Sequence, residues 1–332
     1  MRILFFSAKS YDEEYFTIAN EAFGFELSFI EAPLGLNTLG LAQNCQAVCV
    51  FVNDKLDAAV LEGLAQRGVK VVALRCAGFN NVDLAAAAKL GITVVRVPAY
   101  SPEAVAEHAV ALILTLSRKT HKAYNRVREG NFSLERLTGF NLFQKTVGVV
   151  GTGKIGQAFC KIMLGFGCRV LAFDLYPSEE MKALGIEYVD FASLLEQSDI
   201  ISLHCPLNPH THHLLDEKAF SQIKKGATLI NTSRGGLVDT AAVIQALKHG
   251  QIRALGIDVY EQEEHLFFRD LSELIIQDDL IARLMSFPNV LVTAHQAFFT
   301  QEALGEIATI SLSNIAAWQK GESLENEVKF SE

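Results

Sequence analysis

The sequence of 332 residues lacks a dense basic cluster, a long apolar run and a low-complexity segment. Because the formal net charge is −9 and the basic residues are dispersed, nucleic acid and anionic membranes are not expected as partners. No apolar stretch approaches the length of a membrane span, and the apolar segment 1–6 is too short for a signal peptide. We therefore expect a globular, cytoplasmic protein.

Paired cysteines at metal-ligand spacing are also missing. The six cysteines are scattered at positions 45, 49, 76, 160, 168 and 205, and we expect them to be small buried hydrophobic residues. Histidines gather at positions 204, 210, 212 and 213, but no acid or cysteine completes a familiar zinc-ligand spacing. The sequence therefore predicts no metal site.

Apolar material, by contrast, is ample: hydrophobic residues make up 50% of the chain, enough for large cores, and the length suggests two domains. Strand and helix patterns alternate through the first hundred residues. Strands are predicted near 2–6, 26–30, 47–50, 69–74 and 93–95, and helices near 13–22, 57–67 and 83–90. Such alternation is typical of a parallel sheet covered by helices on both faces.

A glycine motif begins near residue 146. A predicted strand, a turn containing Gly151, Gly153 and Gly156, a helix and a second strand precede Asp174, which is the dinucleotide-binding pattern. Gly151 would permit the tight turn, and Gly153 would let a pyrophosphate approach the helix N-terminus. Gly156 would let helix and strand pack closely, and Asp174 would bind the adenosine ribose. The alternative is a glycine turn with a purely structural role.

The alternation resumes after this motif. Strands predicted near 200–204, 228–231, 254–258 and 290–292 complete a second doubly wound sheet. A long apolar helix is expected from 104 to about 128, buried between domains or subunits, and a closing helix at 301–318 is expected to return to the first domain. The predicted organisation is a discontinuous domain of residues 1–100 and 299–332, a second domain of residues 101–298, and a hinged cleft between them.

Arg234, Glu263 and His295 each follow a predicted strand, which is where parallel sheets place their ligands. Hydride transfer to a carbonyl needs a proton donor, and a histidine beside a carboxylate is suited to that role. An arginine binds a carboxylate through two parallel hydrogen bonds. Taken singly, a strand-end histidine commonly caps or packs, and loop arginines and acidic runs are commonly solvated. A nicotinamide over the same strand ends would join the three into an active site.

The chain resembles the D-isomer-specific 2-hydroxyacid dehydrogenase family over nearly its whole length. Besides the glycine motif, the resemblance is carried by the segments SPEAVAEH (101–108), LHCPL (203–207), NTSRGG (231–236), GIDVY (256–260) and HQAFFT (295–300). The insertion from 263 to 288 is similar to the D-lactate branch of the family. The resemblance implies an α/β fold with two doubly wound parallel sheets, a Rossmann NAD-binding domain and a flavodoxin-like substrate domain.

The family's pattern also implies roles for the matching residues. Arg234 would anchor the substrate carboxylate and carbonyl, His295 would be the acid/base, and Glu263 would make His295 more basic. Asp258 would line the nicotinamide end, with a charge available to Arg234 or to the cofactor amide. Further cofactor contacts are implied for Lys154, Ile155, Cys205, Pro206, Thr211, Thr232 and Ser233. Substrate contacts are implied for Phe51, Ala77, Gly78, Tyr100 and Phe299.

These roles imply a D-lactate dehydrogenase activity, the reversible reduction of pyruvate by NADH. No cation adjoins Asp174, which favours NAD over NADP. A sister enzyme for a branched 2-oxo acid, hydroxypyruvate or glyoxylate remains open, as does an NAD(H)-sensing, corepressor-like binding protein. Cys205 departs from the aliphatic residue common in the family, and we expect a small apolar wall there rather than a reactive thiol. We also expect a homo-oligomer, because the long helix would expose apolar surface.

Overall fold

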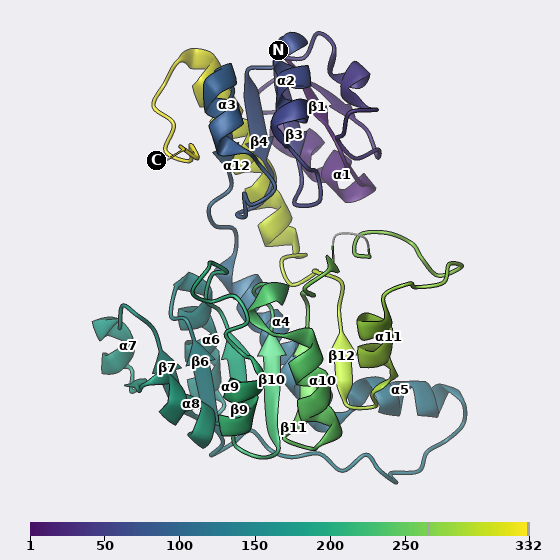
Figure 1. Cartoon of the computed structure of the whole chain (residues 1–332), viewed down its shortest axis with the longest axis vertical. Coiled ribbons are helices and arrows are strands. Elements are labelled where there is room, and N and C mark those ends of the chain that lie inside the picture. The colour runs from purple at the N-terminus through teal and green to yellow at the C-terminus, as the bar shows by residue number, and fades with distance from the viewer. Residues whose placement is uncertain (264–265, 331–332) are drawn as a thin grey trace. The chain divides into compact units, whose positions relative to one another are not determined.

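The computed structural model describes residues 1–263 and 266–330. The chain forms two compact units (Figure 1): Met1–Ser101 with Phe298–Glu332 make the first, and Pro102–Ala297 make the second. Each unit has its own sheet, and every paired strand in both sheets runs parallel. This confirms the predicted α/β class with two doubly wound parallel sheets.

The first unit is built on a five-stranded sheet with the order β2-β1-β3-β4-β5. Its strands are β1 (Arg2–Phe5), β2 (Glu26–Phe29), β3 (Ala47–Val50), β4 (Val71–Leu74) and β5 (Thr93–Arg96). Every residue of β3 and β4 is buried, as expected for central strands covered on both faces.

The helices of the first unit come from both ends of the chain. They are α1 (Ser10–Asn20), η1 (Leu39–Ala42), α2 (Ala58–Gln66), α3 (Leu84–Leu90) and α12 (Gln301–Lys320). The helix α12 begins after Thr300, whose hydroxyl accepts the N–H of Ala303 and caps the first turn. It packs on α1, β4 and β5, so the last helix of the chain completes the unit that the first residues begin (Figure 1).

The second unit has a seven-stranded sheet with the order β12-β11-β10-β9-β6-β7-β8. Its strands are β6 (Thr146–Val150), β7 (Arg169–Phe173), β8 (Glu187–Tyr188), β9 (Ile200–Leu203), β10 (Ala227–Asn231), β11 (Ile252–Ile257) and β12 (Val290–Val292). Its helices are α4 (Pro102–Arg118), α5 (Thr120–Arg128), α6 (Lys154–Gly165), α7 (Glu179–Ala183), α8 (Phe191–Gln197), α9 (Glu217–Gln222), η2 (Gly235–Leu237), α10 (Thr240–Lys248) and α11 (Asp279–Ser286). Because these strands are parallel, their carboxyl ends meet at one edge of the sheet, and most of the predicted site residues follow them there.

The prediction of one helix from 104 to about 128 is wrong. The helix α4 ends at Arg118, Lys119 adopts a left-handed conformation with φ of +54°, and α5 starts at Thr120. The carbonyl of Ser117 is packed so closely against Gly139 that a Cβ there would lie 2.2 Å from its oxygen. Neither glycine nor proline occurs between 102 and 128 except at Pro102, so the sequence carries no signal for this break.

The cysteines follow the prediction: all six are free and buried. Among the residues that the structure describes, we find no helix with the length and apolar character needed to span a membrane.

Candidate active site

The glycine motif forms the turn between β6 and α6. Gly151 has φ of +93°, and a Cβ there would lie 2.7 Å from the backbone nitrogen of Cys205. A Cβ on Gly156 would lie 2.0 Å from the carbonyl oxygen of Gly151, so only glycine allows this approach of helix to strand. Gly153, by contrast, has open space where a Cβ would stand. The protein's own packing therefore explains two of the glycines, whereas Gly153 leaves room for a ligand.

That room lies at the start of α6. Gly153 is the N-cap of this helix, and the first N–H to bond back along it is that of Gln157, which donates to the Gly153 carbonyl. The N–H groups of Lys154 and Ile155 belong to the first turn and have no acceptor within the helix. Such a helix N-terminus favours the negative charge of a pyrophosphate.

Asp174 follows β7 and is bound to the glycine turn. Its Oδ2 accepts hydrogen bonds from the backbone N–H of Thr152 at 2.6 Å and from the hydroxyl of Thr152 at 3.0 Å. Its Oδ1 accepts the N–H of Tyr176 at 2.9 Å. The side chain remains half-buried, and the two residues after it, Leu175 and Tyr176, are exposed and uncharged. The carboxylate therefore stays accessible beside the glycine turn, as the predicted ribose contact requires, and neither of the two residues that follow it carries a charge that could bind a 2′-phosphate.

Cys205, Pro206 and Thr211 form the turn after β9. The hydroxyl of Thr211 donates to the carbonyl of Pro206 at 2.7 Å, and the hydroxyl of Ser233 donates to the carbonyl of Cys205 at 2.7 Å. Because Ser233 follows β10, the second bond joins two neighbouring strand-end loops. Burial raises the pKa of the Cys205 thiol to about 11, so this thiol is neutral at neutral pH. A neutral, buried thiol is suited to form an apolar wall and is not a nucleophile.

The loop that carries Arg234 is shaped by Asn231. The Nδ2 of Asn231 donates to the carbonyl of Arg234 at 2.9 Å, and its Oδ1 accepts the N–H of Ser233 at 3.1 Å. The half-buried guanidinium of Arg234 donates to the carbonyl of Ser233 at 2.8 Å, and no carboxylate among the described residues pairs with it. The buried hydroxyl of Thr232 has no hydrogen-bond partner in the described part of the chain. Donors of this loop thus remain for an anionic ligand.

Gly235 brings the Arg234 loop against the loop that follows β11. A Cβ on Gly235 would lie 2.1 Å from the carbonyl carbon of Tyr260 and 2.3 Å from the backbone nitrogen of Glu261. No other residue fits this approach. The loop that carries Arg234 therefore lies directly beside the segment that carries Glu263.

His295 and Glu263 are in hydrogen-bond contact. Nδ1 of His295 lies 2.8 Å from Oε1 of Glu263, and Oε2 of Glu263 accepts the N–H of Tyr260 at 2.9 Å. The two side chains are 18% and 23% exposed, so solvent screens the pair only in part. His295 has φ of +52°, and its N–H donates to the carbonyl of Asp258 at 2.7 Å. With Nδ1 facing the carboxylate, Nε2 is left for proton transfer.

Asp258 is fully buried, and the structure gives its carboxylate a set of partners that the sequence did not indicate. Oδ1 accepts the hydroxyl of Thr293 at 2.5 Å and the N–H of Gln296 at 2.9 Å, and Oδ2 accepts the N–H of Ala297 at 2.8 Å. His108, from α4, places Nε2 3.4 Å from Oδ1. Burial raises the pKa of Asp258, but these hydrogen bonds outweigh it and hold the pKa below its ordinary value.

These bonds involve the backbone on both sides of His295. The carboxylate of Asp258 accepts the N–H groups of the two residues after His295, and the carbonyl of Asp258 accepts the N–H of His295 itself. His108 adds a contact of 3.1 Å between its Nε2 and the hydroxyl of Thr293. The carboxylate therefore holds the conformation of the loop that presents His295. Among the described residues it makes no contact with Arg234.

Three of the predicted substrate residues gather in the first unit around Phe298. The ring centroid of Phe298 lies 6.0 Å from those of Phe51, Tyr100 and Phe299. The ring of Tyr11 lies 4.7 Å from that of Phe299. Phe51 and Phe298 are buried, whereas Phe299 is 47% exposed. The cluster thus offers one accessible aromatic face that is supported from behind by buried rings.

Ala77 and Gly78 lie in the loop after β4, also in the first unit. The carbonyl of Ala77 accepts a hydrogen bond from Arg96 at 2.8 Å, and that of Gly78 accepts the thiol of Cys76 at 3.3 Å. Both carbonyl groups are thereby engaged within the unit, which fixes the conformation of the loop.

Several residues that shape these sites were not singled out from the sequence. Asn231 and Phe298 stood inside the family motifs, so their positions were a usable signal. Thr293 is close to His295 in the chain, but nothing in its surroundings marked it. His108 ends the family motif at 101–108, and Tyr11 lies outside the motifs. Both are far along the chain from the residues they contact, and no spacing rule could have paired them.

The structure therefore brings Arg234's loop, Glu263 and His295 together at the strand ends of the second unit, on the same side of the sheet as the glycine turn and Asp174. The predicted substrate residues Phe51, Ala77, Gly78, Tyr100 and Phe299 belong to the first unit. Chemically, the second unit combines a helix N-terminus with N–H groups that have no acceptor within the helix, a half-buried carboxylate, a guanidinium without a carboxylate partner among the described residues, and a histidine–carboxylate pair.

Comparison with known proteins agrees with this chemistry. Residues 110–297 match the NAD-binding domain of the D-isomer-specific 2-hydroxyacid dehydrogenases. The chain is 55% identical over 328 residues to D-lactate dehydrogenase of Escherichia coli strain K12, covering 99% of this chain and 100% of that protein. The solved apo-structure of the E. coli enzyme matches with a TM-score of 0.92 at 52% identity, over 99% of this chain and 100% of that one. The structure of D-lactate dehydrogenase with NAD⁺ from Lactobacillus jensenii matches with a TM-score of 0.84 at 34% identity, over 99% and 100%. The chain belongs to the D-isomer-specific 2-hydroxyacid dehydrogenase family, an NAD-dependent oxidoreductase family, and its second unit contains the NAD-binding domain.

Proposed function

We propose that this protein is an NAD-dependent D-lactate dehydrogenase that interconverts pyruvate and D-lactate. The observation that carries the proposal is the contact of 2.8 Å between His295 and Glu263 in an NAD-binding domain. The segment that carries Glu263 lies beside the loop that carries Arg234. Relatives that are more than half identical over nearly the whole chain bear the name D-lactate dehydrogenase.

The glycine turn, the first turn of α6 and Asp174 would hold the cofactor, because the open space at Gly153 and the half-buried carboxylate fit its pyrophosphate and ribose. When bound, NADH supplies the hydride that reduces the substrate's carbonyl carbon. Ser233, Thr232, Cys205, Pro206 and Thr211 would line the rest of that groove.

The protein's own residues would handle charge and protons. Arg234 would bind the carboxylate of the 2-oxo acid and polarise the adjacent carbonyl. His295, protonated beside Glu263, would deliver a proton from Nε2 to the carbonyl oxygen as that oxygen becomes a hydroxyl. In the reverse direction neutral His295 would take the hydroxyl proton of D-lactate. Asp258 would act as a positioning residue that holds the loop of His295 in place.

Phe51 and Phe299 would enclose the substrate's methyl group, with Tyr100, Ala77 and Gly78 completing the substrate contacts. The accessible ring of Phe299, backed by Phe298 and Tyr11, supports this assignment. A methyl pocket made by aromatic walls would favour pyruvate over branched or aromatic 2-oxo acids.

The test is NADH oxidation with a panel of 2-oxo acids of increasing side-chain length, with chiral analysis of the product from pyruvate. We expect kcat/KM to be highest for pyruvate and the product to be D-lactate. The variant Phe299→Ala should lose activity on pyruvate and gain relative activity on longer side chains. Phe330→Ala, which removes a ring that is 50% exposed in the first unit, serves as the control. L-lactate as product, or no turnover of any 2-oxo acid, would refute the proposal; a uniform loss across the panel in Phe299→Ala would limit Phe299 to packing.

We further propose a homo-oligomer. The apolar residues of α4 are largely covered within the second unit, but Tyr124, Val127, Phe132, Leu134 and Phe143, on α5 and the segment after it, are 50–81% exposed. Exposed apolar side chains that gather in one segment of the chain favour association. Sedimentation of the wild type and of the double variant Phe132→Asp, Leu134→Asp tests this, because the variant should dissociate.

A cytoplasmic location is supported by the six free, buried cysteines, since thiols are maintained in a reducing compartment.

A further inference from the structure

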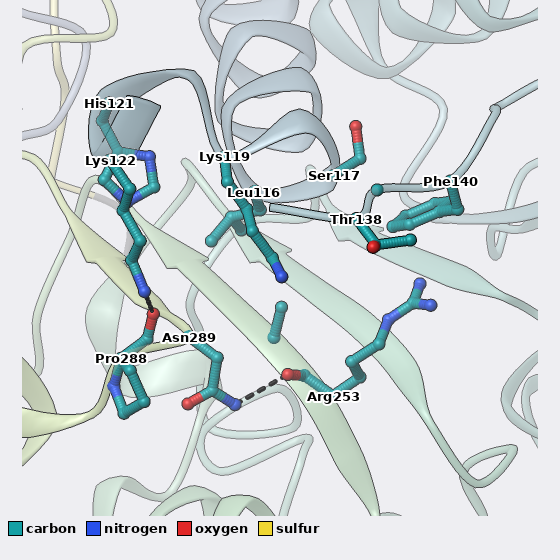
Figure 2. A pocket seen from close by; sticks show the side chains of 12 residues that line it. Leu116, Ser117, Lys119, His121, Lys122, Thr138, Phe140, Arg253, Pro288 and Asn289 are labelled. Carbon is teal, nitrogen blue, oxygen red and sulfur yellow. Dashed lines mark hydrogen bonds between the residues drawn. The ribbon is translucent and has the colours of Figure 1, made fainter. Parts of the chain in front are cut away.

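A cavity of about 230 Å³ opens in the second unit, away from the strand-end loops described above (Figure 2). It is bounded by the break between α4 and α5, by the segment around Phe140, and by the beginnings of β11 and β12. Arg253 is the second residue of β11, and Asn289 immediately precedes β12. Because the strands are parallel, this is the edge of the sheet opposite to the one that carries Arg234, Glu263 and His295.

The cavity is lined by positive charge. Lys119, Lys122 and Arg253 contribute to its wall together with His121, and none of the described residues that line it is acidic. Figure 2 shows the side chains of Lys119, Lys122 and Arg253 extending from different elements around the same space. Like charges so arranged repel one another, and the cost grows as they are removed from water.

Burial and this crowding of charge act on the pKa values of the lining groups. Burial lowers the pKa of Lys122, and the neighbouring charges of Lys119 and Arg126 lower it further. Burial and the charge of Lys122 likewise lower the pKa of His121. Burial also lowers the pKa of Arg253. The charge of Asp199 raises the pKa of Arg253 but does not outweigh burial, so the pKa values of all three groups lie below their ordinary values.

Hydrogen bonding in the cavity is incomplete as well. Nδ1 of His121 is buried and has no partner among the described residues. The ammonium groups of Lys119 and Lys122 donate to the neutral carbonyls of Arg136 and Pro288, which leaves donors on both. The guanidinium of Arg253 lies 3.9 Å from the ring centroid of Phe140, and no side-chain hydrogen bond or ion pair engages its edge within the described ranges. Stacking of this kind fixes the plane of a guanidinium while its fork of donors stays available.

We propose that this cavity is a binding site for a compact anion carrying two or more negative charges, of the phosphate or small dicarboxylate type. Arg253 would contact it with its fork of donors, and Lys119 and Lys122 would supply point charges. Such an anion would offset the repulsion among the lining cations and satisfy their unused donors. The site is distinct from the candidate active site, since the two lie at opposite ends of the same parallel strands.

The experiment is isothermal titration of the whole protein, without substrate or cofactor, using inorganic phosphate in one arm and malonate in the other. Sodium chloride at matched ionic strength separates specific binding from screening. We expect one of the two probes, or both, to bind and to raise the melting temperature beyond the effect of chloride. The arm that responds identifies the anion class.

Variants locate the binding. Arg253→Gln should weaken it at least about tenfold, the loss expected when a charge-assisted hydrogen bond is removed. Lys122→Gln should also weaken it, and this second variant keeps the stacking of Arg253 on Phe140. Arg234→Gln should leave it intact, which separates this site from the candidate active site. Lys161→Gln, at an exposed lysine paired with Glu180, controls for the loss of one positive charge.

Binding no stronger than that of chloride in both arms would overturn the proposal. So would wild-type affinity in both Arg253→Gln and Lys122→Gln, or loss of binding in Arg234→Gln alone. None of these outcomes depends on the identity of the 2-oxo acid that the enzyme reduces.

Discussion

The two oxygens of the Glu263 carboxylate have different partners: Oε1 lies 2.8 Å from Nδ1 of His295, and Oε2 accepts the backbone N–H of Tyr260. The second bond prevents the carboxylate from rotating away from the histidine. Glu263 is therefore a fixed counter-charge for His295, and its removal has a predictable effect on the pH dependence of the reaction.

In Glu263→Gln the side chain keeps its shape but loses its charge, so the imidazolium form of His295 loses support. Pyruvate reduction needs that form, and the falling limb of kcat/KM for pyruvate should move to lower pH. D-lactate oxidation needs neutral His295, so its rising limb should move the same way. Glu261→Gln is the matched control, because Glu261 contacts His213 at 2.6 Å instead. A limb that stays in place in Glu263→Gln but moves in Glu261→Gln would reassign the pair; Glu264, the next acid along the chain, lies outside the described residues.

Arg234→Lys should lower kcat/KM for pyruvate by about a hundredfold or more, on the order of 3 kcal/mol of transition-state binding, because an ammonium cannot present the two parallel donors of a guanidinium. Steady-state kinetics with saturating NADH measures this. Arg169→Lys is the control, since Arg169 makes a two-point contact with Glu187 on the surface of the same unit. Near-normal kcat/KM in Arg234→Lys would remove Arg234 from the substrate site.

Asp174→Ala should narrow the preference for NADH over NADPH by about tenfold or more, chiefly by weakening NADH, because the ribose hydroxyls lose their acceptor and a 2′-phosphate is no longer repelled. The quantity to compare is kcat/KM for each cofactor at saturating pyruvate. The bonds from Thr152 and Tyr176 will also be lost, so melting curves should be recorded alongside. An unchanged ratio of the two kcat/KM values would show that Asp174 does not contact the ribose.

The burial of His204, which follows β9, makes the free energy of unfolding depend on pH in the acid range. Burial lowers its pKa from 6.5 to about 3, so below pH 6.5 the unfolded chain takes up a proton that the folded chain refuses. The free energy of unfolding should therefore fall as pH decreases from 6.5 towards 3, by up to about 1.4 kcal/mol per pH unit from this group. Denaturant titrations across this range should give a shallower pH slope for His204→Gln than for the wild type. His249→Gln, at an exposed histidine that ends α10, should keep the wild-type slope; the same slope in all three proteins would contradict the prediction.

Most of the fold was accessible from the sequence because buried parallel strands and capped helices leave strong local patterns. The strands that became β3, β4 and β6 are almost wholly apolar, and Thr300 marks the start of α12. The break at Lys119 was not accessible, because no helix-breaking residue marks it and the segment that packs against it, around Gly139, lies outside the predicted helix.

The candidate site likewise has some features that could be predicted from the sequence and others that could not. The glycine motif and the pairing of Glu263 with His295 could be anticipated from motifs, since each residue follows a strand that the sequence already predicts. The partners of Asp258 could not be anticipated, because His108 lies on α4 and is separated in the sequence from Asp258, which follows β11, by many intervening elements. The cationic cavity was equally hidden, since Lys122 and Arg253 meet only when the sheet is assembled.

The return of α12 to the first unit has a consequence for synthesis. A growing chain completes the contiguous segment Pro102–Ala297 before α12 has been made, so the nucleotide-binding unit can fold while the first unit still lacks the helix that covers β4 and β5. The unit begun first is thus the last to mature, and during that interval the apolar faces of its central strands depend on a segment that the ribosome has not yet released.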